Sequence, residues 1–134
     1  MGYSWADPDK LEYEERPPKE GEQARTTADL TTALALEQSR ARLWRYPPHS
    51  TGRRHRDHVQ EEVFVVVSGT LTALLGEEPE RADLGPGGVV RVEPMTALQL
   101  RNESGEELVF FAYGAPAVQE GADFLDDVEL PPKN

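Results

Sequence analysis

The sequence predicts an all-β fold, a small antiparallel barrel or sandwich, and three observations indicate it. Apolar runs of strand length recur at a spacing of roughly 8–12 residues, about seven or eight in all. Turn residues separate them, with 11 Gly and 11 Pro in the chain. No regular alternation of strands with helices appears. A chain of 134 residues is long enough to bury one core, so we expect a single domain.

Composition and charge exclude several classes of protein. There is no Cys, so the chain has no disulfide framework, thiolate nucleophile or zinc–thiolate site. The formal net charge is −11, whereas a nucleic-acid binder needs positive charge on its contact face. No apolar run reaches transmembrane length, and the start lacks a basic segment followed by an apolar one. We therefore expect a soluble cytoplasmic protein that binds neither nucleic acid nor membranes.

Three regions are expected along the chain. Residues 1–28 are predicted to form a polar N-terminal arm, because prolines and a glycine interrupt any helix and acidic residues keep it solvated. The barrel is expected over residues 29–117. Residues 118–134 are predicted to form an acidic C-terminal tail that is loosely attached to the barrel.

Within the barrel, a short helical turn is expected at 29–36, for which Thr26, Thr27 and Asp29 are candidate caps. Strands are expected wherever β-branched, aromatic and aliphatic residues form short runs or alternate with polar ones. Clusters of Gly, Pro and Asn separate them. The expected strands are 39–46, 62–67, 70–75, 81–84, 89–92, 97–101 and 107–113.

A cluster of candidate ligands directly precedes the most apolar strand, within residues 52–69. Because side chains alternate along a strand, Glu62 shares its face with the apolar residues two and four positions later. We expect that face to point into the barrel, opposite two leucines of the strand at 97–101. The expected pocket residues are His55, Asp57, His58, Glu62, Phe64, Val66, Leu98 and Leu100. Trp44 or Leu43, and Phe110 or Phe111, are expected to complete the lining.

In these residues the chain resembles the cupin superfamily. The first cupin motif is G-x5-H-x-H-x(3–4)-E-x6-G, and the interval from Glu62 to Gly69 fits its end. The second motif is approximately G-x5-P-x-G-x2-H-x3-N, and both Gly88 to Pro94 and Leu98 to Asn102 fit its spacing. The resemblance covers about residues 41–117. It implies a double-stranded β-helix, or jelly-roll, cupin barrel with an extended N-terminal arm.

The sequence departs from both motifs at the histidines. Counting four residues back from Glu62 places the H-x-H pair on His55 and Asp57, and counting three places it on Arg56 and His58. The histidine of the second motif falls on Leu98, which binds no metal, and the neighbouring Gln99 should point to the opposite face. A typical metal cupin presents three His and one Glu. The resemblance therefore implies a reduced site, made either of His55, Asp57 and Glu62 or of His58 and Glu62.

Two states of this site are open. It holds a divalent metal such as iron, manganese, zinc or nickel, or it holds none and Glu62 bonds to a histidine and water. A buried Glu62 without a metal should be paired or have a raised pKa, and it would then suit general acid–base catalysis on a small carbonyl compound.

Three function classes follow from these residues. The first is a protein that binds a small molecule in the barrel and has a degraded metal site. The second is a metal-dependent oxygenase or isomerase, and the third is a structural dimeric domain without a ligand. Whether the chain is an enzyme is left open. The arginines at 53–56 are expected to draw an anionic ligand to the barrel mouth, to form a solvated loop or to be part of a subunit contact. The resemblance also implies a homodimer, to which an arm carrying Trp5, Leu11 and Tyr13 would contribute.

Overall fold

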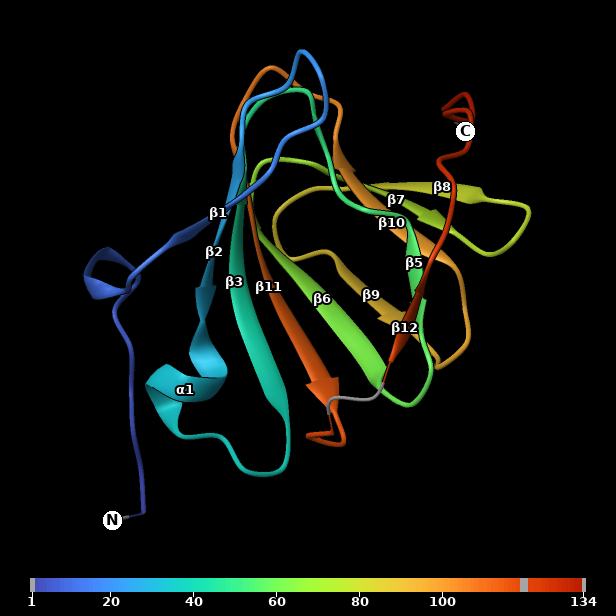
Figure 1. Ribbon diagram of the computed structural model, residues 1–134. Helices are drawn as coiled ribbons and strands as arrows, with labels where there is room; N and C mark the ends of the chain where they lie inside the picture. Colours follow the sequence, from blue (N-terminus) through green and yellow to red (C-terminus); the bar gives the residue numbers. More distant parts are fainter. Residues whose placement is uncertain (1, 119–120, 134) are drawn as a thin grey trace.

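The computed structural model describes residues 2–118 and 121–133, which form two antiparallel sheets (Figure 1). In spatial order the first sheet contains β1 (Glu14–Arg16), β2 (Arg25–Asp29), β3 (Arg40–Tyr46), β11 (Leu108–Ala115), β6 (Glu61–Ser68) and β9 (Val89–Val92). The second sheet contains β12 (Ala122–Phe124), β5 (His55–Asp57), β10 (Leu98–Asn102), β7 (Leu71–Leu75) and β8 (Glu80–Leu84), with β4 (Ser50–Thr51) beside β10. The all-β prediction is confirmed.

The seven strands expected from the sequence all occur, because each places apolar side chains on an inner face. In β6, Phe64 and Val66 are buried, whereas Val67 is 55% exposed on the outer face. Phe110 of β11 is fully buried at the centre of the core, and its ring packs against those of Trp44, Tyr46 and Phe64. Full burial of such a side chain contributes about 1.5–3 kcal/mol.

The short helical turn also forms, as α1 (Leu30–Leu34). Its N-cap is Asp29, whose carboxylate accepts hydrogen bonds from the backbone N–H and the hydroxyl of Thr32. One turn of 3-10 helix, η1 (Pro8–Lys10), lies earlier in the chain. Within the described residues no helix is long and apolar enough to cross a membrane.

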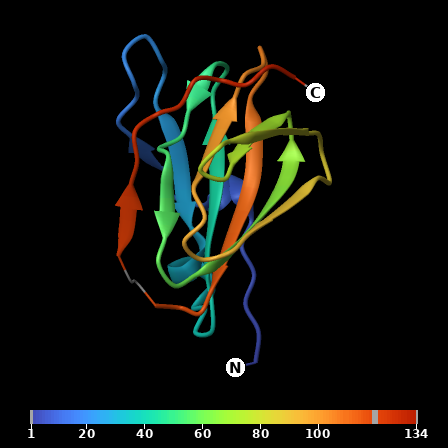
Figure 2. The same cartoon turned by 90° about the vertical axis from the view of Figure 1, so that its right-hand side faces the viewer.

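The sheets extend past both boundaries that were expected for the barrel. β1 pairs with β2 as a hairpin, and β2 pairs with β3 and so joins the first sheet. At the other end of the chain β12 pairs with β5, and Figures 1 and 2 place these strands side by side at the edge of the second sheet. These strands are short and polar, so their pairing depends on distant partners and leaves no local pattern. The division into arm, barrel and tail stays a prediction.

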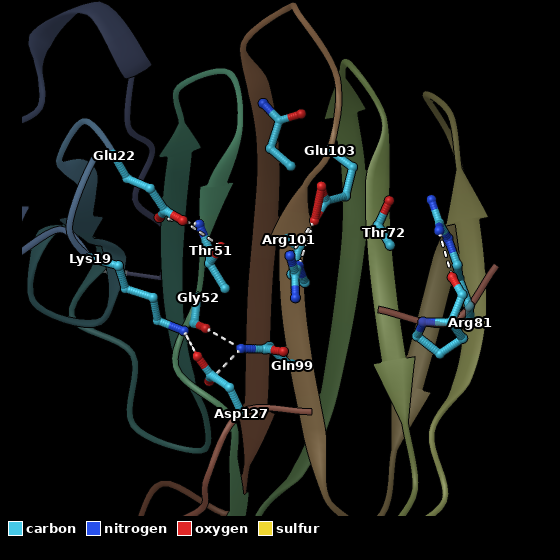
Figure 3. Close-up of polar contacts among 12 residues, drawn as sticks. Lys19, Glu22, Thr51, Gly52, Thr72, Arg81, Gln99, Arg101, Glu103 and Asp127 are labelled. Atoms are coloured by element: carbon cyan, nitrogen blue, oxygen red, sulfur yellow. Dashed lines mark hydrogen bonds and ion pairs between the residues drawn. The ribbon is translucent and has the colours of Figure 1, made fainter. Parts of the chain in front are cut away.

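The outer face of the second sheet is polar and binds both flanking segments (Figure 3). Both carboxylate oxygens of Glu22 accept hydrogen bonds from Thr51, one from its backbone N–H and one from its hydroxyl, each at 2.8 Å. Gln99 of β10 donates to the carbonyl of Gly52 and to Asp127, which also pairs with Lys19. Gln99 therefore points to the opposite face from Leu98 and Leu100, as the alternation of β10 predicts.

Candidate functional site

Three of the candidate ligands lie close together, although they come from strands of different sheets. His55 and Asp57 are two residues apart on β5 and so share a face, and Glu62 lies near the start of β6 in the other sheet. The His55 Nε2 atom is 3.6 Å from Asp57 Oδ2 and 3.9 Å from Glu62 Oε1. One donor atom from each residue lies within 4.8 Å of the other two. We call these three residues the polar cluster.

A backbone hydrogen bond sets the orientation of the His55 ring. Nδ1 of His55 lies 3.0 Å from the carbonyl oxygen of Arg53. Because a carbonyl only accepts, Nδ1 carries the hydrogen, and Nε2 is the nitrogen directed at the two carboxyl groups. In the neutral ring Nε2 has a free lone pair, which is the arrangement that a proton or a metal ion requires.

The two carboxyl groups of the polar cluster have very different pKa values. Burial, the hydrogen bond to Asp57 and the negative charge of that residue raise the pKa of Glu62 to about 9. Burial alone would raise the pKa of Asp57 as well, but hydrogen bonds with His55 and Glu62 outweigh it and lower this pKa to about 2. At neutral pH Asp57 is therefore ionised and Glu62 holds a proton.

The ring of His55 is shifted toward its charged form. Burial lowers its pKa, but the hydrogen bonds to Asp57 and to the Arg53 carbonyl outweigh this effect. The pKa of His55 therefore lies above its usual value, because ionised Asp57 stabilises the imidazolium.

The polar cluster lies on the wall of a cavity of about 600 Å³ between the two sheets. Much of the remaining wall is apolar and includes Trp44, Tyr46, Phe64, Leu100 and Phe110. This is the usual construction of a small-molecule site, in which a few convergent polar groups interrupt an apolar lining.

The family comparison supports the same architecture. A family model described as a cupin domain matches residues 42–113. The chain belongs to the cupin family. None of the curated proteins matches its sequence.

Several solved structures share the cupin fold with this chain. The putative sugar phosphate isomerase from Acidithiobacillus ferrooxidans is 25% identical, with a TM-score of 0.66 over 75% of this chain and 65% of that chain. A sugar phosphate isomerase from Silicibacter pomeroyi is 21% identical, with a TM-score of 0.74 over 92% of this chain and 83% of that chain. The polyketide cyclase RemF from Streptomyces resistomycificus is 17% identical, with a TM-score of 0.76 over 94% of this chain and 87% of that chain.

The structure places the two candidate histidines of this cupin differently. His55 lies in the cavity wall, whereas the side chain of His58 is 41% exposed and its Nε2 is 2.9 Å from Asp123 Oδ1 of β12. The chain turns after Asp57, so the alternation that joins His55 and Asp57 does not continue to His58. Of the two motif alignments, this arrangement favours His55 and Asp57.

Leu98 occupies the place of the missing third histidine. It is fully buried and stands directly across from His55 in the pairing of β10 with β5. Leu98 and Val66 belong to the apolar core and are not among the described residues that line the cavity, whereas Phe64 and Leu100 line it. The sequence left open whether Trp44 or Leu43, and whether Phe110 or Phe111, completes the lining. Trp44 and Phe110 are the residues that line the cavity.

The donor set of the polar cluster fits a divalent metal. One imidazole and two carboxylates offer the nitrogen and oxygen ligands that iron(II) and manganese accept. His55, Asp57 and Glu62 would hold the ion, and water or a bound molecule would complete its coordination. Binding requires that Glu62 and His55 give up their protons, so the affinity for the metal should rise with pH.

Five arginines also line the cavity, and of these only Arg53 was expected near the barrel mouth. The others are Arg16 of β1, Arg25 of β2, and Arg40 and Arg42 of β3. The sequence could have indicated that Arg40 and Arg42 face the cavity, because they alternate along β3 in the same phase as Trp44 and Tyr46. No sequence pattern indicated the position of Arg16 and Arg25, because only the pairing of β1 with β2 brings them to this wall.

Proposed function

We propose that this cupin binds a small organic molecule inside its barrel, in contact with His55, Asp57 and Glu62. The single observation that carries the proposal is the position of the polar cluster on the wall of a 600 Å³ cavity that is otherwise rich in aromatic side chains. A concave, largely apolar wall that is interrupted by a few convergent polar groups is the usual construction of a small-molecule site.

The polar cluster has chemistry suited to a carbonyl or hydroxyl group of such a molecule. Asp57 offers a carboxylate that accepts a hydrogen bond, and the neighbouring Glu62 carries a proton that it can donate. A molecule that lies against both groups is oriented by one donor and one acceptor, while the aromatic wall holds its apolar part.

A second candidate function is a metal-dependent enzyme of the isomerase or oxygenase type. The observation in its favour is the convergence of three donor atoms within 4.8 Å. A divalent cation held by His55, Asp57 and Glu62 would act as a Lewis acid toward an oxygen of the bound molecule. The likeness to a putative sugar phosphate isomerase at 25% identity supports the isomerase type.

A fragment-binding experiment tests the first function. Ligand-detected NMR with a library of small polar compounds should find molecules that bind the wild-type protein. Glu62→Gln should weaken their binding at least tenfold, and Ala112→Phe, which fills the cavity from β11, should abolish it. Glu61→Gln is the matched control, because Glu61 is the adjacent residue on the outer face and pairs with Arg91 at 2.9 Å.

Two results would overturn the proposal. One is that no fragment binds to the wild-type protein. The other is that fragments bind equally well to the wild-type protein, Glu62→Gln and Ala112→Phe. Circular dichroism of each variant must first show a folded protein, and Ala112→Leu replaces Ala112→Phe if the larger ring prevents folding.

We also propose that the protein forms a homodimer. The N-terminal arm packs on the outer face of its own first sheet through Leu11, but it leaves Trp5 80% exposed and stacked on Tyr3. Val67 and Val89 of the same sheet are also exposed. A second copy related by a two-fold axis would cover the arm and sheet residues of both chains at once.

Light scattering tests the dimer. The wild-type protein should have the mass of two chains, and Trp5→Ser should shift it toward one chain. Met95→Ser, which removes another exposed apolar side chain, from a turn, is the control. A monomeric wild-type protein would remove this proposal.

A further inference from the structure

We propose that the molecule bound in the cavity is a small organic anion, and that its carboxylate or phosphate group binds the arginines on the inner face of β1, β2 and β3. This inference rests on the proposed small-molecule function. We call Arg16, Arg25, Arg40 and Arg42 the arginine wall.

The charge of the cavity is opposite to that of the protein. The chain has a net charge of −11, yet five arginines line the cavity against two carboxyl residues, Asp57 and Glu62. Such a concentration of one sign in a concave wall focuses the field and attracts the opposite charge.

The pairing of the strands brings like charges together. Arg16 and Arg25 are directly opposite each other in the pairing of β1 with β2, and both guanidinium groups lie over the ring of Trp44, at 5.9 and 5.4 Å from its centroid. Like charges directly opposite in a sheet are destabilising. Glu14 offsets part of this cost through its ion pair with Arg16. An anion at the wall would offset the remainder.

Arg25 is available to such an anion. It donates a hydrogen bond to the hydroxyl of Tyr46 and stacks on the rings of Trp44 and Tyr46. These contacts hold the guanidinium plane in place without neutralising its charge. Among the described residues no carboxylate forms an ion pair with it. A fixed, planar guanidinium of this kind suits the bidentate recognition of a carboxylate or phosphate.

The strand register places the arginine wall across the cavity from the polar cluster. In the first sheet, Gly114 of β11 stands between Arg40 and Glu62, and Ala112 stands between Arg42 and Phe64. The side chain of Gln60 lies over Gly114, where an added Cβ would be 3.1 Å from its Oε1. Ala112 lines the cavity and leaves open the space that separates β3 from β6, which is about 10 Å for two strand spacings. A molecule of a few carbon atoms would span it, with its anionic group on Arg42 or Arg40 and its reactive oxygen at Glu62.

The fluorescence of Trp44 reports on this wall directly. The chain has two Trp residues, so Trp5→Phe leaves Trp44 as the single emitter. In that background we would titrate inorganic phosphate and acetate in separate arms at constant ionic strength, with glycerol as the uncharged comparison. At least one anion should give a saturable change at millimolar concentration, glycerol should give none, and the better anion identifies the preferred group.

The matched variants are Arg42→Gln, Arg25→Gln and Arg45→Gln. Arg45 lies on β3 like Arg42 but faces outward, where it pairs with Glu107 at 3.4 Å. Arg42→Gln or Arg25→Gln should weaken anion binding at least tenfold, whereas Arg45→Gln should change it less than twofold. If neither anion binds, or if all three variants behave alike, the inference is overturned.

The two proposals fail in different ways. If uncharged fragments bind to the cavity and depend on Glu62 but no anion does, the small-molecule function stands and the anion inference is overturned. If anions bind but Ala112→Phe does not weaken their binding, the anion site lies outside the cavity. The anion inference is then overturned, and the fragment experiment alone decides the small-molecule function.

Discussion

Residues of the same type, only one to three positions apart, have opposite environments in this cupin. Glu62 lies in the cavity with a raised pKa, whereas the adjacent Glu61 is solvated and paired with Arg91. His55 joins the polar cluster, and His58 pairs with Asp123 on the outside. The comparison teaches that the local course of the backbone, and not the residue type, decides which side chains are available for chemistry.

The largest expected difference between the two faces is in stability. Phe110 is fully buried among three aromatic rings, whereas its neighbour Phe111 faces outward and stacks on Tyr113. Phe110→Ala should lower the free energy of unfolding by about 3–5 kcal/mol, and Phe111→Ala should lower it by less than about 2 kcal/mol. Urea denaturation measures both, and equal losses would contradict the inward assignment of Phe110.

The next difference is the pH dependence of stability. The pKa of Glu62 is about 9 in the folded protein and has its ordinary value of 4.5 in the unfolded chain. As the pH rises from 5 to 8 the unfolded chain releases this proton and the folded protein keeps it, so stability falls. His55 acts in the same direction because its folded pKa is raised, and Asp57 is ionised in both states throughout this range.

Glu62→Gln should therefore flatten the pH profile. The titration of Glu62 should cost the wild-type protein about 2–4 kcal/mol of stability between pH 5 and pH 8, and this loss should be absent in Glu62→Gln. Glu61→Gln should keep the wild-type slope. Thermal or urea unfolding across this range checks the prediction, and a wild-type protein whose stability is the same at both pH values would refute it.

A metal titration separates the two histidines. At a manganese concentration about a hundredfold above the dissociation constant at pH 8, the protein should gain about 2–3 kcal/mol of stability at that pH. The same concentration should give a smaller gain at pH 6, because the ion displaces protons from Glu62 and His55. His55→Gln should abolish the gain and His58→Gln should keep it. Equal gains in both variants, or no gain in the wild-type protein at either pH, would argue against a metal at the polar cluster.

The sequence predicted those parts of the site that depend on local alternation. The seven apolar strands, the inward face of Phe64 and the outward face of Gln99 all follow from the spacing of side chains along one strand. The sequence left His55 and His58 undecided, because the choice depends on where the three-residue strand β5 ends. It did not indicate that Arg16 and Arg25 reach the cavity, since their position depends on a hairpin of polar residues with no apolar pattern.

The smallest predicted effect concerns the outer face of the second sheet, where polar contacts replace the apolar core (Figure 3). Glu22→Gln keeps one oxygen acceptor for Thr51 and loses the other, together with the negative charge that strengthens both hydrogen bonds. Such a loss costs about 1 kcal/mol, and Glu20→Gln, an exposed neighbour without these contacts, should cost less. Because Glu22 lies on the far side of the second sheet from the cavity, the variant should bind fragments and anions like the wild-type protein. Weakened binding in Glu22→Gln would mean that the outer face also shapes the cavity, and the separation between the two faces would then be incomplete.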